Sequence, residues 1–509
     1  MLHRISGPGI IHPEEWLDGR CFSASRTLSH LSAHQSMFDF EFDEFEDPAS
    51  EDELRDLVDA YERNLRMDAD AYFDSEALEH IATYYFESDR LVDALHVVDR
   101  SLAAQPYSSD PWLRRGILLN HLDRHDEALV AYDRALSLNP ADSETIVNRG
   151  ITLDTLGRAE DALEAYDIAL SFSPGHADAL FNKGISLEKL ARHDDALDAL
   201  HQCAELDPEH PEVWYELGYT YDQLERLEDS VRSYDRQIDV DPYAQNAWYN
   251  KGIVLNRLGK FEEAVSSYDF ATAICDDFAS AWYNRGNALA NLGRTHEAID
   301  SYLQVLDFEP GDAATFYNLG IAYEELEDYP TAVSYLLRAV QDDPEYAEAW
   351  YSLGCCYDAT GRNGDALGAF AKAIALQPEI GEYWHARADA EYNAGRLAEA
   401  LRSYAHVVHL DAGNAEAWLD LAETRLESGL VGEALEAYGQ VLRLKPAASE
   451  VHLRRAQVLA SVGQRESAER ALDRACELEP IRSEEFRSAY GEVWGVARSG
   501  GHQGGGKQY

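Results

Sequence analysis

The stretch AWYNKGIVLNRLGKFEEAVSSYD, residues 247–269, returns as AWYNRGNALANLGRTHEAIDSYL, residues 281–303, with 12 of the 23 positions identical. In both copies apolar residues recur three and four positions apart, as they do on one face of an amphipathic helix. Neither copy holds a metal cluster or a phosphate-binding loop. Self-similarity at a fixed period of about 20–50 residues is typical of repeat proteins, so this period decides the fold.

Prolines mark the period along most of the chain. A single lattice with a 34-residue spacing holds the following prolines: Pro106, Pro140, Pro174, Pro208, Pro242, Pro310, Pro344, Pro378, Pro446 and Pro480. Asp276 and Ala412 fill its two gaps. With this proline at position 32, twelve repeats run without an insertion from Ser75 to Arg482. Positions 1–34 of the repeat are used below.

Large and small residues alternate at fixed positions of the repeat. Position 4 holds seven of the nine tryptophans, position 8 is always Gly or Ala, and position 20 is Ala in eleven repeats. Position 24 is mostly Tyr or Phe, and position 15 is often Gly. Apolar spacing of three and four in each half predicts two amphipathic helices, joined by a turn in which the Gly serves as a left-handed helix cap.

This pattern, W-x2-L-G-x2-Y followed by A-x3-F and a closing Pro, resembles the tetratricopeptide repeat family. The resemblance covers Ser75–Arg482, about four fifths of the chain. It implies an all-α fold, an α-solenoid in which about twelve 34-residue helix-turn-helix repeats form a right-handed superhelix with a concave groove. Position 7 departs from the family, because it is often Arg or Lys, and position 25 is often Asp. We expect an ion pair between the two helices.

The segments outside the repeats are expected to be caps and tails. Residues 51–74 hold an amphipathic segment that predicts an N-terminal capping helix, and residues 483–499 predict a C-terminal one, because the end repeats of a solenoid otherwise expose their stacking faces. Residues 1–50 are expected to be a disordered extension, and the Gly-rich residues 500–509 a disordered tail. Residues 1–36 carry no net charge, so translation from Met37 is the alternative interpretation.

The charge balance excludes several classes of partner. The chain has 43 Lys and Arg against 94 Asp and Glu, a net charge of −51. Phosphate backbones and anionic membrane surfaces would be repelled, so we expect neither nucleic acid nor membrane as a partner. Acids spread along the whole chain, with little Lys, favour a solvated surface suited to high salt. Six cysteines without CxxC spacing and an N-terminus without a signal peptide favour the cytoplasm.

The motifs of catalysis are missing from the sequence. The segments that begin at His125, His193 and His296 lack the second His that a helical zinc pair requires, and they fall at the turn between helices. GxSxG, Walker and kinase signatures do not occur. We therefore expect no enzyme activity and no catalytic, cofactor or metal site.

The candidate binding site is a row of amides at position 6. This position holds Asn148, Asn182, Asn250, Asn284 and Asn318, interrupted by Glu216. In the family the position faces the concave groove, where an amide can donate to and accept from a peptide backbone. Position 5 would add aromatic walls from the following residues: Tyr215, Tyr249, Tyr283, Tyr317 and Tyr351. Acids at position 12, including Asp154, Glu188 and Asp222, would favour a basic ligand.

Two functions follow from these features. The first is a protein–protein interaction scaffold that binds an extended, basic or neutral peptide or partner protein along repeats 3–8. The alternative is a structural assembly factor that self-associates or organises a larger complex, with Tyr and Asn kept only for packing. A chaperone adaptor is rejected, because its family signature needs Lys at position 2, which is Glu or Asp in nine repeats. The partner and the oligomeric state stay open.

Overall fold

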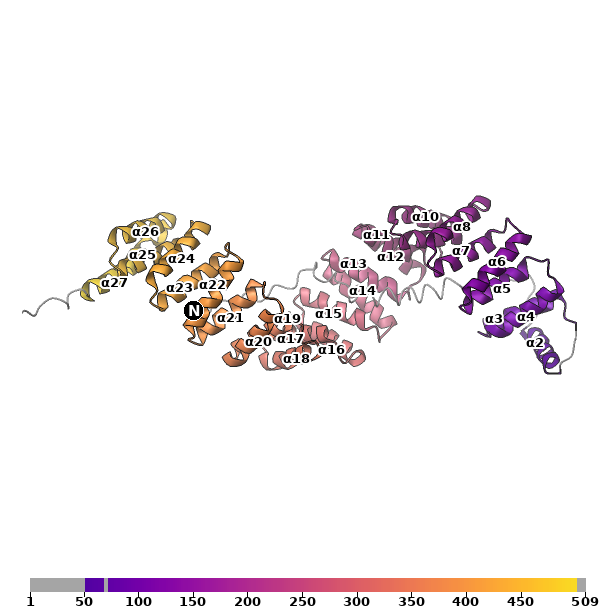
Figure 1. Ribbon diagram of the computed structural model, residues 1–509, viewed down its shortest axis with the longest axis horizontal. Coiled ribbons are helices and arrows are strands. Elements are labelled where there is room, and N and C mark those ends of the chain that lie inside the picture. The colour runs from indigo at the N-terminus through magenta and orange to yellow at the C-terminus, as the bar shows by residue number, and fades with distance from the viewer. Residues whose placement is uncertain (1–50, 68–71, 501–509) are drawn as a thin grey trace, which may run out of the picture. The chain divides into compact units, whose positions relative to one another are not determined.

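A computed structural model describes residues 51–67 and 72–500 of the 509-residue chain. The expectations for residues 1–50, including the start at Met37, and for residues 501–509 lie outside this range. The chain divides into two compact parts, Met1–Leu292 and Gly293–Tyr509, and each is described by itself. Every regular element in the described residues is helical (Figure 1). The expected all-α class is confirmed.

The first part contains the helices α2 to α15. Their bounds are α2 Glu51–Arg66, α3 Ser75–Glu87, α4 Leu91–Ala104, α5 Asp110–His121, α6 His125–Leu138, α7 Ser143–Thr155, α8 Ala159–Phe172, α9 Ala177–Lys189, α10 His193–Leu206, α11 Val213–Gln223, α12 Leu227–Val240, α13 Gln245–Arg257, α14 Phe261–Ile274 and α15 Ala279–Asn291. Within this part the two helices of each complete repeat pack against each other, from α3 with α4 to α13 with α14, and each second helix packs on the first helix of the next repeat.

The second part contains the helices α16 to α27 and one short 3₁₀ helix. Their bounds are α16 Thr295–Phe308, α17 Ala313–Glu325, α18 Tyr329–Asp342, α19 Ala347–Ala359, α20 Asn363–Leu376, α21 Gly381–Asn393, α22 Leu397–Leu410, α23 Ala415–Glu427, α24 Val431–Leu444, α25 Ser449–Ser461, α26 Arg465–Leu478, η2 Pro480–Arg482 and α27 Ser483–Gly500. Typically the first helix occupies positions 1–13 and the second positions 17–30, so the α-solenoid of helix-turn-helix repeats is confirmed.

The turn at position 15 is left-handed, as the glycines predict. Gly157 has φ 74°, and the six other glycines at this position also have positive φ. The N–H of Arg158, one residue later, bonds back to the carbonyl of Leu153 at 2.9 Å and closes the end of α7. Five non-glycine residues adopt the same conformation: Asp89, Asp123, Ala191, Glu225 and Glu327. The turn is therefore imposed by helix packing even where the residue disfavours it.

The small residue at position 8 leaves room for the large one at position 24. A Cβ on Gly150 would lie 2.5 Å from Cε1 of Tyr166, a side chain that is fully buried. The ring therefore fills the space above the glycine and draws α7 and α8 together. Gly184 accommodates Leu200 in the same way. The sequence pattern did not say which large side chain covers position 8, and the structure shows that it is the one at position 24.

Tryptophan at position 4 bonds to the connection between repeats. The indole N–H of Trp214 donates to the carbonyl of Pro208 at 2.9 Å, and that of Trp248 donates to Pro242 at 3.1 Å. Where the lattice lacks proline, Trp282 donates to the carbonyl of Asp276 at 2.9 Å. Position 4 therefore satisfies a backbone carbonyl at the repeat junction in addition to packing beside it.

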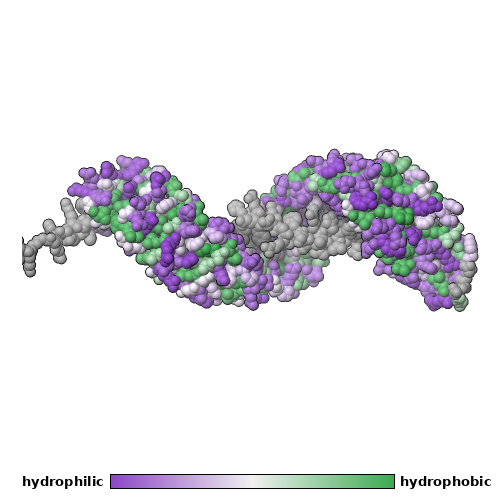
Figure 2. Space-filling model, in the orientation of Figure 1, coloured by the Kyte–Doolittle hydropathy of each residue, from purple (hydrophilic) through white to green (hydrophobic). Residues whose placement is uncertain are grey.

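The ion pairs expected from positions 7 and 25 form between repeats and not within one. The Nε of Arg149 in α7 donates to Oδ1 of Asp133 in α6 at 2.8 Å, and 16 residues separate the two. Four further pairs repeat this geometry: Arg115–Asp99, Lys183–Asp167, Lys251–Asp235 and Arg285–Asp269. Figure 2 shows hydrophilic and hydrophobic residues interspersed over the visible surface of each part.

Helices flank the repeats in both ranges where capping helices are expected. α2 packs on α3 through the buried Val58 and Tyr61, and Phe486 of α27 is buried against α25 and α26. That these helices act as caps remains a prediction. Among the described residues no helix is both long and apolar enough to cross a membrane.

Candidate binding surface on the first helices

The residues at position 6 lie on helices that follow one another side by side. In the first part α5 contacts α7, α7 contacts α9, α9 contacts α11, and α13 contacts α15. Asn148, Asn182, Asn250 and Asn284 lie on α7, α9, α13 and α15. The fold therefore brings these four residues, which we call the amide row, onto successive first helices. Asn318 lies on α17 in the second part, where it is half-buried.

Backbone carbonyls fix the orientation of three amides in the row. The Nδ2 of Asn148 donates to the carbonyl of Glu144 at 3.1 Å, and that of Asn182 donates to Asp178 at 2.8 Å. The Nδ2 of Asn284 donates to Ser280 at 3.0 Å. A carbonyl oxygen only accepts hydrogen bonds, so the nitrogen of each side chain must face its own helix. The oxygens Oδ1 of these amides are left to accept from another group.

Two amides also bond across the repeat junction. The Nδ2 of Asn250 lies 2.8 Å from the hydroxyl of Tyr215, and the Nδ2 of Asn284 lies 3.1 Å from that of Tyr249. Each tyrosine is at position 5 of the preceding repeat. The Tyr-Asn dipeptide therefore has a structural role that links neighbouring first helices, as well as any role in binding.

The expected aromatic walls require a correction. Tyr249, Tyr317 and Tyr351 have exposed fractions of 3%, 5% and 9%. Tyr249 packs on Phe278 with ring centroids 4.7 Å apart, and Tyr351 packs on Tyr383 at 5.0 Å. Rings buried in this way fill the space between repeats and offer a ligand little surface. Tyr215 and Tyr283 are half-buried and keep an accessible edge.

The acids at position 12 are engaged by the protein itself. Asp154 has an exposed fraction of 4%, and its Oδ2 accepts from the Nζ of Lys189 at 2.5 Å. Asp222 forms an ion pair with Arg257 of the next repeat. Burial raises the pKa of Asp222, and Arg257 opposes that shift. The expectation that these acids attract a basic ligand is therefore wrong for Asp154 and Asp222, because internal cations neutralise them.

Glu188 has a different partner from the other two acids. Its carboxylate accepts a hydrogen bond from the hydroxyl of Thr220 in α11. The next first helix, α11, carries Glu216, which has an exposed fraction of 7%. Burial, followed by the charge of Glu212, raises the pKa of Glu216 to about 8. Burial and Glu216 likewise hold the pKa of Glu188 well above its usual range.

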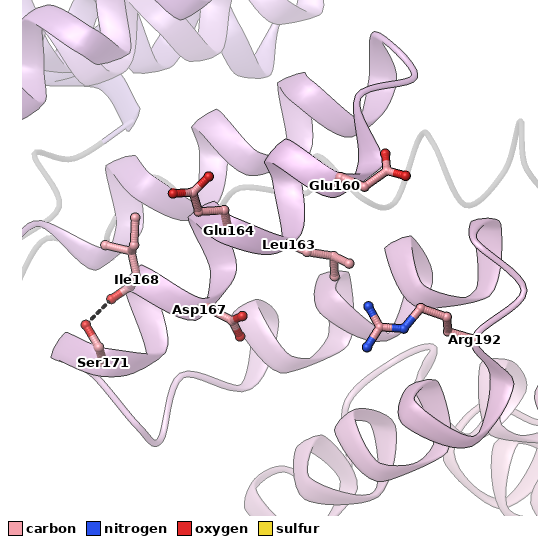
Figure 3. Close-up of a pocket in the computed structure, with 7 residues that line it drawn as sticks. All are labelled: Glu160, Leu163, Glu164, Asp167, Ile168, Ser171 and Arg192. Carbon is pink, nitrogen blue, oxygen red and sulfur yellow. Dashed lines mark hydrogen bonds between the residues drawn. The ribbon is translucent and has the colours of Figure 1, made fainter.

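The structure also has a depression away from the amide row, lined mainly by residues of the second helix α8. The depression, of about 460 Å³, is lined by Glu160, Leu163, Glu164, Asp167, Ile168, Ser171 and Arg192, which Figure 3 shows. The hydroxyl of Ser171 donates to the carbonyl of Ile168 at 2.6 Å within it. Two of its charges are already paired, since Asp167 binds Lys183 at 2.6 Å and Arg192 binds Asp195 at 2.7 Å.

The described residues hold no group of three His, Cys, Asp or Glu side chains arranged to bind a metal ion.

Family models described as "Tetratricopeptide repeat" match residues 147–211, 181–237, 317–380, 385–449 and 419–483, and also residues 109–142 and 279–312. A model described as "TPR repeat" matches residues 254–293. The chain belongs to the tetratricopeptide repeat family.

Parts of this chain are similar to several solved structures. MamA from Desulfovibrio magneticus RS-1 is 22% identical over 33% of this chain and 96% of its own, with a TM-score of 0.32. YrrB, described as a TPR protein with an unusual peptide-binding site, is 22% identical over 37% of this chain and 96% of its own, with a TM-score of 0.34.

The C-terminal part of a TPR protein from Cytophaga hutchinsonii is 15% identical over 46% of this chain and 96% of its own, with a TM-score of 0.42. At these identities the likeness concerns the fold alone. No curated protein matches the sequence.

Within this tetratricopeptide repeat chain, sequence reasoning missed two features of the surface. It treated Glu216 only as a break in the amide row, whereas the structure buries this acid, and burial raises its pKa to about 8. A signal was present, because Glu216 is an acid where the other repeats from the third to the eighth carry Asn, and a buried acid needs either a partner or a proton. Sequence reasoning also missed that Lys189 and Arg257, at position 13, neutralise the acids at position 12 of the preceding repeat.

Proposed function

We propose that this tetratricopeptide repeat protein is a non-enzymatic scaffold that binds an extended segment of a partner protein along the amide row. The observation that supports this most directly is the fixed orientation of the amides. Asn148 and Asn284 are half-buried, and each uses its nitrogen on its own helix. Each therefore presents an acceptor oxygen, on a helix that lies in the same row.

A row of acceptors selects a ligand that supplies donors. An extended peptide offers backbone N–H groups along its length, and Lys or Arg side chains offer more. The oxygen of Asn182 is buried without a hydrogen-bond partner, so it contributes only if the surface opens locally. The net charge of −51 disfavours acidic ligands throughout. The ligand is therefore basic or neutral, although Asp154 and Asp222 do not select it.

The test separates ligand contact from helix-to-helix contact. Partners are identified by affinity purification, and the bound segment is then measured as a synthetic peptide by calorimetry. Asn284→Ala removes the amide, whereas Tyr249→Phe removes only the hydrogen bond between repeats and leaves the oxygen of Asn284 in place. We expect Asn284→Ala to weaken peptide binding by about 0.5–1.5 kcal/mol and Tyr249→Phe to leave it nearly unchanged.

Combining Asn148→Ala with Asn284→Ala should weaken binding further, and Asn139→Ala is the control, because that exposed asparagine follows α6 outside the row. Unchanged affinity of a folded double variant would overturn the proposal. If Asn284→Ala and Tyr249→Phe weaken peptide binding by the same amount, the amide affects binding only through the packing of neighbouring repeats. Light scattering of the free chain addresses the alternative, since growth of the particle with concentration would favour self-assembly.

A further inference from the structure

The connection between α10 and α11 departs from the regular repeat. The helices α7, α9 and α13 begin at position 1, whereas α11 begins at Val213, position 3 of its repeat. In a regular helix the N–H of Tyr215 would bond to the carbonyl of Pro211, four residues earlier. Here the buried side chain of Gln237 in α12 bonds to both groups, because its Nε2 donates to that carbonyl at 2.5 Å and its Oε1 accepts from that N–H at 3.1 Å. A side chain from another helix therefore replaces a helix bond at the start of α11.

His210, in the same connection, is a second side chain that holds this start. It is buried, and its Nδ1 accepts from the backbone N–H of Glu212 at 3.3 Å. Its ring packs on that of Phe181 in α9, with ring centroids 4.4 Å apart. An N–H can donate only to a ring nitrogen that carries no proton, so Nδ1 is unprotonated and the neutral imidazole keeps its proton on Nε2. The imidazole thus ties the backbone just before α11 to α9.

Acids lie near His210, but burial favours its neutral form. Its Nε2 is 3.9 Å from Oδ1 of the exposed Asp178 in α9, and the other oxygen of Asp178 is 3.7 Å from Nδ1 of His176. Burial lowers the pKa of His210, and the charges of Asp178 and Asp207 oppose that shift without reversing it. On α10, burial raises the pKa of the Cys203 thiol to about 12, so this neighbour is uncharged. The acids therefore offset only part of the cost of a positive charge at His210.

We propose that His210 is an acid-sensitive latch that holds the start of α11 against α9. In the neutral state the imidazole accepts the N–H of Glu212 and packs on Phe181. Protonation places a second N–H on the ring at Nδ1, so this bond is lost and a charge is buried. The connection and the first turn of α11 then open to water. The latch is a property of the ligand-free chain and does not depend on the proposed function.

The direction of the pH effect follows from the burial of the imidazole. The folded chain binds this proton less tightly than the unfolded chain does, because the pKa of His210 is lowered on folding. The stability that the latch contributes is therefore complete above the ordinary histidine pKa of about 6.5 and is lost as the pH falls through the lower pKa of the folded chain. In acid the open population should grow about tenfold for each unit by which folding lowers the pKa.

The test is hydrogen exchange on the full chain without ligand. Wild type is compared with His210→Asn at pH 7 and pH 5, because an asparagine oxygen can accept a backbone N–H two residues on but does not titrate. For residues 207–223 we expect the ratio of the wild-type exchange rate to that of the variant to rise about threefold or more between pH 7 and pH 5. For residues 143–172, which hold no histidine, the ratio should stay constant.

Two further variants keep the result decisive. His176 occupies the same position one repeat earlier, so His176→Asn is the matched control and should keep the acid response of wild type. Asp178→Asn removes an acid that favours the charged imidazole, so it should enlarge the response at pH 5, and it serves if His210→Asn fails to fold. A ratio for residues 207–223 that stays constant between pH 7 and pH 5 would overturn the latch. So would an acid response that shrinks in Asp178→Asn.

Discussion

Asn250 donates to the hydroxyl of Tyr215 at 2.8 Å, although 35 residues separate them. The bond joins α13 to α11 and repeats as Asn284 to Tyr249 at 3.1 Å. A single repeat cannot form it, because its two members belong to neighbouring repeats. The tyrosine at position 5 therefore stabilises the junction in this way only where the next repeat carries asparagine at position 6, because the tyrosine of one repeat accepts from the asparagine of the next.

Removing the hydroxyl should weaken this junction without creating a cavity. We expect Tyr215→Phe to lower the free energy of unfolding by about 0.5–1.5 kcal/mol, the usual net worth of one hydrogen bond. Tyr243→Phe is the control, because Tyr243 is exposed and should change stability by less than about 0.5 kcal/mol. Urea denaturation followed by circular dichroism measures both, and equal midpoints for the two variants would contradict a stabilising role for the bond.

Adding a methyl group at position 8 should destabilise the fold where an aromatic ring lies above that position. Gly150→Ala places a Cβ 2.5 Å from Cε1 of Tyr166, and overpacking of this kind costs about 1–3 kcal/mol. Gly368→Ala in α20 is the matched control, since its Cβ would meet nothing within 4 Å. There the substitution should stabilise by about 0.5–1 kcal/mol through helix propensity. Thermal melts compare the two, and the same sign for both would contradict the packing argument.

Natural alanines at position 8 accompany a different tyrosine geometry. In the second part Ala388 coincides with a hydrogen bond from Tyr404 to Asp389, and Ala422 with one from Tyr438 to Glu423 at 2.6 Å. Asp389 and Glu423 occupy position 9. The third repeat has Ile151 there, so Gly150→Ala gains no such acceptor for the Tyr166 hydroxyl.

His385 should make the second part sensitive to pH near neutrality. Burial lowers the pKa of His385, but the hydrogen bond to Asp420 at 2.9 Å and nearby acids outweigh it, so the net shift is upward. The protonated histidine then stabilises the fold at acid pH, and this contribution is lost as the pH rises through the raised pKa. We expect His385→Gln to lower stability by about 0.5–1 kcal/mol at pH 6 and by little at pH 9. Urea midpoints across this range check it, and a deficit that grows with pH would contradict the sign.

Ion pairs between repeats should each contribute little. Arg149 and Asp133 are partly exposed, and pairs of this kind are worth about 0.2–1 kcal/mol. A double-mutant cycle with Arg149→Ala and Asp133→Ala measures their coupling free energy. We expect it to fall toward zero in 1 M salt. A coupling that persists at high salt would mean that the pair acts through geometry rather than charge.

The whole chain should nonetheless become more stable as salt is added. Screening removes the small contribution of the ion pairs, but it also relieves the self-repulsion of a net charge of −51. At 1 M salt the screening length is about 3 Å, so repulsion between separate surface acids is largely removed. The melting temperature should therefore rise between 0.05 and 1 M NaCl, and a constant or falling melting temperature would refute the prediction.

The secondary structure of the repeats could be predicted from the sequence, because it depends on local rules. Proline at position 32 and glycine at position 15 mark the helix ends, and apolar spacing marks the helix faces. The fit of Tyr166 over Gly150 could not be predicted in this way, because which large side chain covers the glycine depends on how α7 packs on α8.

The partners of polar side chains could not be predicted in this way, because they depend on how one repeat stacks on the next. Position and charge alone suggested that Asp154 and Asp222 faced a ligand, but stacking places Lys189 and Arg257 against them, 35 residues along the chain. The same stacking brings Thr220 to Glu188 and buries Tyr249 between repeats. The sequence by itself determined the repeat and its helices through local periodicity. Only the tertiary structure decided which polar groups remain for a ligand, because burial and distance between repeats set that choice.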